Sequence, residues 1–285
     1  MRLTGSRISC CELLDFPVFI CYNPFVIIFG TERKMKNGIL VYAAPDGDVE
    51  AAEELASRIG AELTRDANTA ASAGLCLRFG GKGAALSGGG MELYADLTRM
   101  IPRIRRGNLN SEILIRAAKP SSLGMSPTAL DATAGLGEDS LLLAAAGFRV
   151  TLCERDPVIA ALLRDSIRRA SDVPELSDAV SRMRFVERDS ISYMNGTSER
   201  FDLILLDPMF PERKKSGLIK KKLQLIQMLE APCDDEEELF SAAYSVSPRK
   251  LLIKRPAKGP YLAGKKPDHS VTGGSVRYDC FRCDK

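Results

Sequence analysis

Residues 129–139 read ALDATAGLGED: an apolar run, then a turn with two glycines, then two acidic residues. The apolar run 129–132 is typical of a buried strand, and the apolar spacing of residues 138–146 is that of a helix. Gly135 and Gly137 would let the backbone of the turn pass close to a ligand, and the start of the helix offers free N–H groups. A plain tight turn could carry the same two glycines, so the neighbouring segments must decide between these interpretations.

Strand-like and helix-like segments alternate after this stretch. The strand-like runs are residues 149–153, 184–186, 203–206 and 251–254. The helix-like runs are residues 157–169, 220–229 and 236–246. Such alternation implies a parallel sheet with helices on both faces, and ligands of these sheets bind outside the carboxyl ends of the strands. We therefore expect an α/β fold, with a Rossmann-like domain over residues 106–285.

The chain before residue 106 has a different pattern of short segments. Glycine turns separate several of them, and a connecting helix is expected after this part of the chain, at residues 111–119. The other expected segments are a strand at 38–44, a helix at 48–59 and short strands at 75–79, 84–86 and 91–96. These patterns predict a small α+β subdomain over residues 35–105.

Residues 1–34 carry no pattern that fits either unit. Their apolar stretch, residues 16–30, is broken by Pro17, Asn23 and Pro24 and is too short for a good membrane span. No clear small-residue cleavage site follows it. We expect residues 1–34 to be an extension outside the fold.

Acidic residues end the first three strands of the expected parallel sheet. Asp131 closes the first strand, and Glu154 closes the second, seventeen residues after Gly137. An acid at that second position binds ribose hydroxyls in Rossmann-like folds. Asp189 ends the third strand and is followed by Ser190, and a carboxylate there can accept a hydrogen bond from an adenine amino group. The three acids together predict a cofactor that contains adenosine.

The acids around the glycine turn favour one such cofactor over another. The order G-L-G-E-D lacks the third glycine of the dinucleotide motif. Asp131, Glu138 and Asp139 would repel a pyrophosphate, whereas they suit the ammonium and sulfonium centres of S-adenosylmethionine. We expect S-adenosylmethionine as the cofactor. A nicotinamide-dependent dehydrogenase is the alternative, and a binding measurement with each cofactor would distinguish them.

The fourth strand runs directly into Asp207-Pro208-Met209-Phe210. This sequence resembles the [D/N]-P-P-[F/Y] motif of methyltransferases that modify exocyclic amines of bases. The Asp207 carboxylate and the Pro208 carbonyl can both accept N–H bonds from the amine, the proline fixes the turn, and Phe210 can stack on a flipped base. We therefore predict Asp207, Pro208 and Phe210 as catalytic residues. A non-enzymatic RNA-binding module would not need this pair of acceptors.

Basic residues are grouped along the chain, although the net charge is only +3. Groups far apart in the sequence can share one face, which would suit a nucleic-acid backbone; a solvated surface is the alternative. We predict RNA contacts for Arg105, Arg106, Arg213, Lys214, Lys215, Lys220, Lys221, Lys254 and Arg255.

Cysteine and histidine usage argues against several other classes. The eight cysteines are scattered without a disulfide framework, which favours a reducing cytosol. Cys280 and Cys283 form one C-x-x-C without a second pair, and His269 is the only histidine. Histidine-centred triads and multi-histidine metal sites are therefore poor candidates, and we expect a cytoplasmic protein with no metal and no membrane association.

From Met35 onward the chain resembles the ribosomal RNA small subunit methyltransferase J family. The resemblance lies in DATAGLGEDS (131–140), CERDPVIAALLRDSI (153–167), LDPMFPERKKSGLIKKK (206–222), KRP (254–256) and RYD (277–279). In this family Met209 is part of the pattern, although a basic residue usually stands where this chain has Glu138. By resemblance, the cofactor contacts are Glu138, Asp139, Glu154, Arg155, Asp189, Ser190 and Asp207.

The resemblance also implies a substrate. It implies methylation of guanine N2 in 16S ribosomal RNA, with small-subunit RNA or the assembling 30S subunit as partner. The motifs alone imply only an exocyclic amine, so adenine-N6 methylation of RNA or DNA is the alternative.

Overall fold

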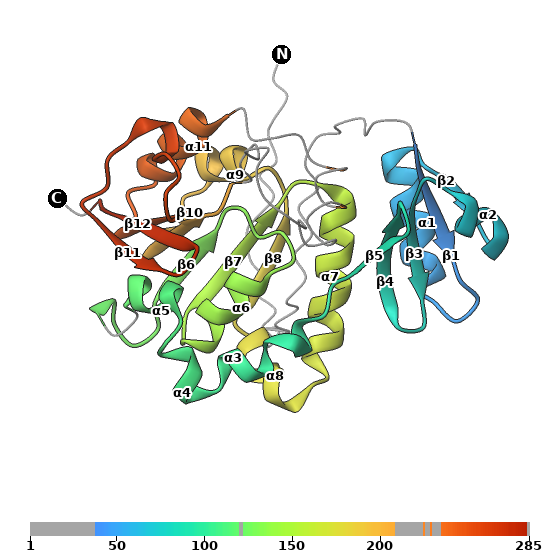
Figure 1. Cartoon of the computed structure of the whole chain (residues 1–285), viewed down its shortest axis with the longest axis horizontal. Coiled ribbons are helices and arrows are strands. Elements are labelled where there is room, and N and C mark those ends of the chain that lie inside the picture. Colours follow the sequence, from blue (N-terminus) through green and yellow to red (C-terminus); the bar gives the residue numbers. More distant parts are fainter. Residues whose placement is uncertain (1–37, 120–121, 209–224, 226–228, 230–234, 284–285) are drawn as a thin grey trace, which may run out of the picture.

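The computed structural model describes residues 38–119, 122–208, 225, 229 and 235–283. These residues form two sheets, a five-stranded sheet near the amino terminus and a seven-stranded sheet formed by the rest of the chain (Figure 1). The predicted extension 1–34 lies outside the described residues, as does most of the helix expected at 220–229. No described helix is long and apolar enough to cross a membrane.

The larger sheet has the strand order β11-β12-β10-β9-β6-β7-β8. Its strands are β6 (Thr128–Asp131), β7 (Arg149–Glu154), β8 (Met183–Glu187), β9 (Leu203–Leu206), β10 (Lys250–Pro256), β11 (His269–Gly273) and β12 (Val276–Arg282). The five strands from β8 to β10 are parallel, which confirms the predicted α/β class. The last two strands add an antiparallel pair that the sequence patterns did not predict.

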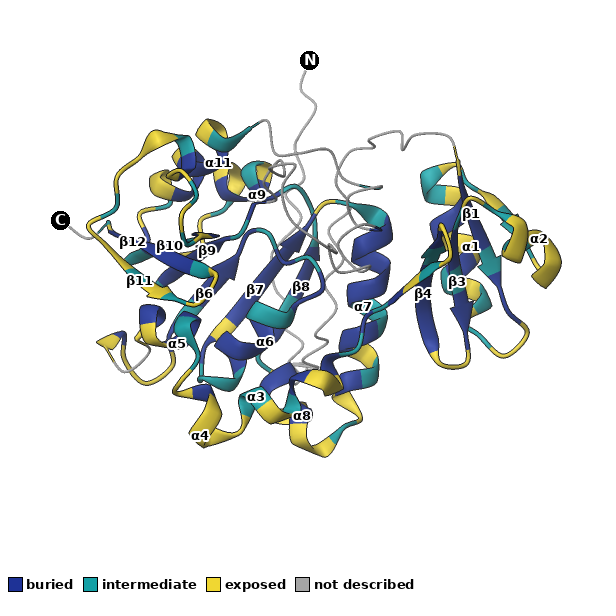
Figure 2. Cartoon of the chain, viewed as in Figure 1, coloured by how far each residue is buried: buried dark blue, intermediate teal, exposed yellow. Residues whose placement is uncertain are grey.

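Helices cover both faces of this sheet, because its strands alternate two sets of apolar side chains. Along β9, Leu203 and Leu205 pack on one face, and Ile204 and Leu206 pack on the other. The first face carries α5 (Ile113–Ala118), α6 (Glu138–Ala145), α7 (Pro157–Ser171) and α8 (Pro174–Val180). The second face carries α9 (Ser190–Gly196) and α11 (Glu236–Ser245). Figure 2 shows that the strands between these layers are largely buried.

The smaller sheet has the order β2-β1-β3-β4-β5. Its elements are β1 (Ile39–Ala43), α1 (Val49–Ile59), β2 (Glu62–Thr64), α2 (Ala67–Ser72), β3 (Leu75–Gly80), β4 (Gly83–Gly88) and β5 (Met91–Tyr94). The connection to the larger sheet runs through η1 (Leu97–Met100), α3 (Ile101–Ile104) and α4 (Arg106–Leu109).

The two sheets share a hydrophobic core through α7. Val41 and Leu77 of the smaller sheet belong to one apolar cluster with Val158 and Leu162 of α7. The same helix also packs on the larger sheet (Figure 1). Polar contacts join the two parts as well: Arg58 of α1 lies 2.8 Å from Glu187 at the end of β8. The predicted division at residues 105 and 106 stays a prediction, and α7 belongs to both cores.

Candidate active site

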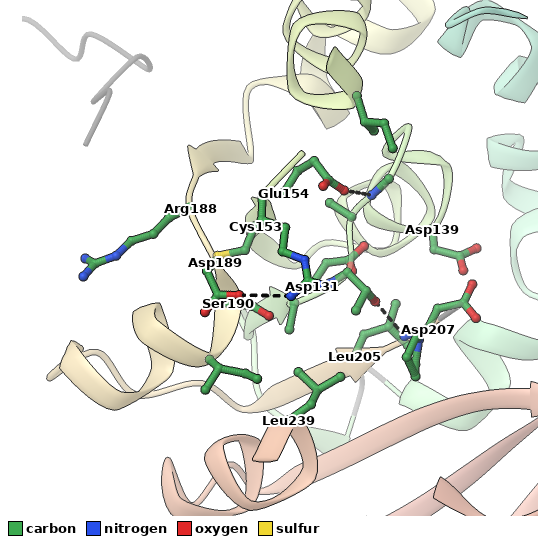
Figure 3. A pocket seen from close by; sticks show the side chains of 18 of the residues that line it. Asp131, Asp139, Cys153, Glu154, Arg188, Asp189, Ser190, Leu205, Asp207 and Leu239 are labelled. Atoms are coloured by element: carbon green, nitrogen blue, oxygen red, sulfur yellow. Dashed lines mark hydrogen bonds and ion pairs between the residues drawn. The ribbon is translucent and has the colours of Figure 1, made fainter. Parts of the chain in front are cut away.

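A pocket of about 270 Å³ opens at the carboxyl ends of β6, β7, β8 and β9 (Figure 3). The strand order explains the position of the pocket. From β6 the chain adds β7 and β8 on one side and then β9 and β10 on the other, and ligands of such sheets bind where the strand order reverses. Most of the predicted cofactor and catalytic residues line this one pocket: Asp131, Gly135, Glu138, Asp139, Glu154, Arg155, Asp189, Ser190, Asp207 and Pro208.

The two glycines of the first turn have different roles. Both have a positive φ, +53° at Gly135 and +77° at Gly137, a conformation that side chains other than glycine rarely adopt. A Cβ added at Gly135 would meet nothing within 4 Å, so the backbone there is open to a ligand. A Cβ added at Gly137 would lie 2.7 Å from Cδ1 of Leu163. Gly137 is not among the residues that line the pocket; we assign it a packing role, and its cofactor contact stays a prediction.

Asp131 lies beneath the glycine turn with 2% of its surface exposed. Its Oδ2 accepts a hydrogen bond of 2.6 Å from the Ser140 hydroxyl, and its Oδ1 accepts one of 3.2 Å from the Thr133 N–H. Burial raises the pKa of this carboxyl to about 7, although the Ser140 hydrogen bond opposes the shift. Asp131 therefore ties the end of β6 to both ends of the turn.

Glu154 holds the turn from the neighbouring strand. It is 6% exposed, and its two oxygens accept hydrogen bonds from the N–H groups of Gly135 (3.0 Å) and Asp156 (2.8 Å). Each carboxylate oxygen has a second lone pair, and Glu154 lines the pocket. The predicted bond to a ribose hydroxyl is thus compatible with this arrangement and stays a prediction.

The third strand end is joined to α11 by Arg155. Its Nη1 lies 3.5 Å from Asp189 Oδ2 and 3.2 Å from Asp235 Oδ2. The other oxygen of Asp189 caps α9 by accepting the Ser192 N–H at 2.9 Å. Asp189 is thereby held at the rim of the pocket, where Ile191 also lies.

Asp207 follows β9 and is held through its main chain and its side chain. Its N–H donates to the Thr133 hydroxyl at 2.6 Å. Its Oδ2 lies 2.8 Å from Nζ of Lys254, and the same Nζ lies 2.7 Å from Oδ2 of Asp139. Burial raises the pKa of Asp207, against the effect of Lys254. Figure 3 shows the Asp139 and Asp207 carboxylates facing one another at the pocket wall.

Lys254 and Arg255, both predicted to contact RNA, have different surroundings in the structure. Lys254 lines the pocket, and its ammonium lies between two carboxylates. Burial alone would lower the pKa of that ammonium, but Asp139 and Asp207 outweigh burial and raise it. Arg255 is 1% exposed; its Nε donates to the Pro260 carbonyl at 2.8 Å. A guanidinium this deeply buried is poorly placed for a nucleic-acid backbone, and the RNA contact of Arg255 stays a prediction.

The remaining predicted RNA contacts are only partly described. Arg105 and Arg106 are exposed at the start of α4, and neither lines the pocket. Several predicted residues lie outside the described residues, namely Phe210, Arg213, Lys214, Lys215, Lys220 and Lys221.

Some side chains of the site were not predicted. The hydroxyls of Thr133 and Ser140 flank the glycine turn; the first accepts the N–H of Asp207 and the second donates to Asp131. A hydroxyl residue on each side of the glycine turn is the sequence signal that could have identified them. Asp235 belongs to an acidic run, 234–238, whose charge is typical of a solvated face. Only the path of the chain brings Asp235 to Arg155.

The pocket suits S-adenosylmethionine in its lining and charge. The open backbone at Gly135 gives a ligand close access to the turn, and Ile191 and Leu239 supply apolar walls. Carboxylates from three elements surround the part of the pocket near β6 and β9, where a cationic ligand would be favoured. Among the described residues, no group of three or more His, Cys, Asp or Glu side chains is arranged to hold a metal ion.

Comparison with known proteins agrees with this site. The family model described as "Putative SAM-dependent methyltransferase" matches residues 83–283. A ribosomal RNA small subunit methyltransferase J from Thioalkalivibrio sulfidiphilus is 37% identical over 242 residues, which cover 81% of this chain and 92% of the relative. The enzyme of that name from Pseudomonas fluorescens is 36% identical over 250 residues, 85% of this chain and 94% of the relative.

A solved structure supports the same assignment. The crystal structure of an S-adenosylmethionine-dependent methyltransferase from Neisseria gonorrhoeae superposes with a TM-score of 0.68 at 27% identity. The match covers 86% of this chain and 96% of that one. The family model and the relatives confirm the predicted cofactor and the resemblance seen in the sequence. The chain therefore belongs to the ribosomal RNA small subunit methyltransferase J family of S-adenosylmethionine-dependent methyltransferases.

Proposed function

We propose that this protein transfers a methyl group to the exocyclic N2 amine of a guanine in small-subunit ribosomal RNA. The observation that carries the proposal is the position of Asp207 and Pro208, which follow β9 and line the same pocket as the glycine turn. The relatives' shared name, ribosomal RNA small subunit methyltransferase J, supports the substrate class.

The chemistry depends on how the amine is held. The nitrogen lone pair of an exocyclic amine is conjugated with the ring, so the amine is a poor nucleophile. The Asp207 carboxylate and the Pro208 carbonyl would each accept a hydrogen bond from one N–H group of the amine. These two hydrogen bonds would turn the nitrogen lone pair toward the pocket. S-adenosylmethionine, when bound, supplies the electrophilic methyl group. Holding two reactants in line can contribute about 7–11 kcal/mol toward the barrier.

Asp207 also provides a place for the proton that the reaction releases. Methylation leaves the nitrogen with an excess proton, and the carboxylate that already accepts its N–H is the nearest base. Burial raises the pKa of Asp207, which brings it closer to the range in which a carboxylate works as a general base.

The substrate partner is proposed on different grounds. Arg105 and Arg106 are exposed and are proposed, with the basic residues 213–221, to contact the RNA backbone. Free small-subunit RNA and the assembling 30S subunit both fit this proposal, and either would place the enzyme in the cytoplasm. Adenine-N6 methylation uses the same two acceptors and is the competing outcome.

The test is single-turnover methyl transfer to small-subunit RNA, followed by mapping of the methylated base. Asp207→Ala should lower the rate by about 10²–10⁴-fold, the range of a positioned acid–base or polar group. Asp207→Asn keeps one acceptor oxygen and should retain more activity. Asp202→Asn is the matched control, because Asp202 lies at the opposite end of β9 and accepts the Thr128 N–H at 2.8 Å.

Two control measurements complete the experiment. Melting curves and S-adenosylhomocysteine binding show that each variant is folded with its pocket intact. Normal turnover in a stable Asp207→Ala enzyme would refute the proposed role of Asp207. Methylation of adenine instead of guanine would refute the proposed substrate.

A further inference from the structure

We propose that Lys254 is a positioning residue for methyl transfer: it binds one oxygen of Asp207 and leaves the other to accept the N–H of the target amine. This inference rests on the proposed function, because it assigns Asp207 as the amine acceptor. It replaces the RNA contact predicted for Lys254 with a role inside the pocket.

The β-sheet register fixes Lys254 beside Asp207. Ile253 of β10 pairs with Leu206 of β9, so the next residue on each strand lies at the same level. Lys254 Nζ lies 2.8 Å from Oδ2 of Asp207 and 2.7 Å from Oδ2 of Asp139. Its ammonium thus contacts both carboxylates at hydrogen-bond distance, and the parallel ladder holds its backbone in place.

The charges explain why a cation is needed at this point. Asp139 comes from the first turn of α6 and Asp207 from the end of β9, and their carboxylates face one another (Figure 3). Two carboxylates this close favour protonation of one of them unless a cation lies between. A protonated Asp207 would carry an O–H donor in place of one acceptor, which is the wrong group for an amine N–H. Lys254 therefore keeps Asp207 in its acceptor form.

The contacts also restrict how Asp207 can turn. Its backbone N–H donates to Thr133 at 2.6 Å, and its Oδ2 is occupied by Lys254. The side chain is still 37% exposed, and Asp207 lines the pocket. Oδ1 is then the oxygen left for the amine, in an orientation that two fixed contacts determine.

A simpler interpretation makes Lys254 a counter-ion that a cationic ligand replaces. In that case, removal of the ammonium would leave methyl transfer intact and would strengthen binding of cationic S-adenosylmethionine. The two interpretations therefore predict opposite results for Lys254→Met.

The rate experiment uses Lys254→Met, Lys254→Arg and the control Lys250→Met. Lys250 is on the same strand, and its Nζ donates to the Ala118 carbonyl at 2.8 Å, outside the pocket. At saturating cofactor and RNA, Lys254→Met should slow single-turnover transfer by about 10²-fold, the effect of a misplaced reacting group. Lys254→Arg keeps the charge and should recover most of the rate, and Lys250→Met should match the wild type. Binding of S-adenosylhomocysteine, which lacks the sulfonium charge, should be unchanged in all three.

The pH dependence gives a readout that a purely structural lysine would not move. Among the described residues, the charged and titratable groups that act on Asp207 are Asp131, Asp139, Lys254, Arg255 and Tyr278. The rate should fall as pH drops through the pKa of Asp207. Lys254→Met removes the cation and should move this acidic limb to higher pH, by about one unit or more. Asp139→Asn removes the competing carboxylate and should move it to lower pH.

The same shifts can be measured without a substrate. In ¹³C NMR titrations, the Asp207 carboxyl carbon, assigned by its loss in Asp207→Asn, should titrate at higher pH in Lys254→Met and at lower pH in Asp139→Asn. If neither variant moves this titration, or if Lys254→Met transfers methyl groups at the wild-type rate, the inference is wrong. A wild-type enzyme that does not methylate small-subunit RNA would refute the proposed function alone, because the titration still tests Lys254.

Discussion

Alanine substitution at Gly135 and at Gly137 should separate cofactor binding from stability. Both positions have a positive φ, so each alanine should cost about 1–2 kcal/mol of backbone strain. At Gly135 nothing else follows for the fold, because a Cβ there has no atom within 4 Å. At Gly137 the Cβ would lie 2.7 Å from Leu163 Cδ1. Leu163 is fully buried, so overpacking should add about 1–3 kcal/mol.

We expect Gly137→Ala to lose mainly stability and Gly135→Ala to lose mainly cofactor affinity. Gly137→Ala should lose about 2–5 kcal/mol of unfolding free energy, or about 4–10 °C in melting temperature, and Gly135→Ala only about 2–4 °C. Gly135→Ala places a methyl group in the space that a bound cofactor needs, so its affinity for S-adenosylhomocysteine should fall about tenfold or more. Gly137→Ala should bind S-adenosylhomocysteine nearly normally at temperatures where it is folded.

Urea unfolding and calorimetric titration of both variants would check this pattern. Wild-type affinity in Gly135→Ala would mean that the turn does not contact the cofactor. Wild-type stability in Gly137→Ala would mean that Leu163 moves aside at little cost, and the packing role assigned to Gly137 would be refuted.

Three further predictions concern single side chains. Glu154→Gln should weaken S-adenosylhomocysteine binding by about 10–100-fold in calorimetry. Glu154 accepts hydrogen bonds from two backbone N–H groups, and the NH₂ of a glutamine amide cannot accept one of them; unchanged affinity would contradict this. Asp131 has a folded-state pKa of about 7, raised from 3.8, so the stability that its protonated form contributes at low pH should be lost as pH rises between these values. The urea midpoint of Asp131→Asn, measured relative to that of the wild type, should therefore be higher at pH 8 than at pH 5. An equal difference at both pH values would show that Asp131 ionises without cost to the stability of the fold. Arg255→Met should destabilise the fold, toward the lower end of about 3–5 kcal/mol because its partner Glu236 is partly exposed. The folded variant should bind RNA normally, and a selective loss of RNA affinity would support the predicted RNA contact of Arg255.

The parallel part of the fold could be predicted from sequence because its signals are local. Short apolar runs alternate with helical patterns, and acids follow the runs at Asp131, Glu154, Asp189 and Asp207. Parallel strands have their carboxyl ends at one edge, so these acids were expected at one edge, and the adjacency of β9, β6, β7 and β8 brings them together. The structure brings all four to one pocket.

Features that depend on partners distant in sequence could not be predicted in this way. Lys254 and Arg255 are adjacent and both basic, yet strand alternation sends one toward Asp139 and the other toward Glu236. Nothing within the local sequence identifies those partners. Strand β11 has the sequence HSVTG, without an apolar run, and forms by pairing with β12.

The core that both sheets share at α7 has a consequence for synthesis of the chain. Leu86 of the smaller sheet belongs to the same apolar cluster as Val158, which is translated 72 residues later. At translation rates of about 5–20 residues per second, Val158 is synthesised roughly 4–15 seconds after Leu86. During that interval α1 can cover only part of the apolar face of β1, β3 and β4, because α7, which covers the rest, has not yet been synthesised. The strands of the smaller sheet are therefore synthesised early, but their hydrophobic core is complete only after α7 has been synthesised. Nascent chains paused before α7 should expose an apolar surface that chaperones recognise.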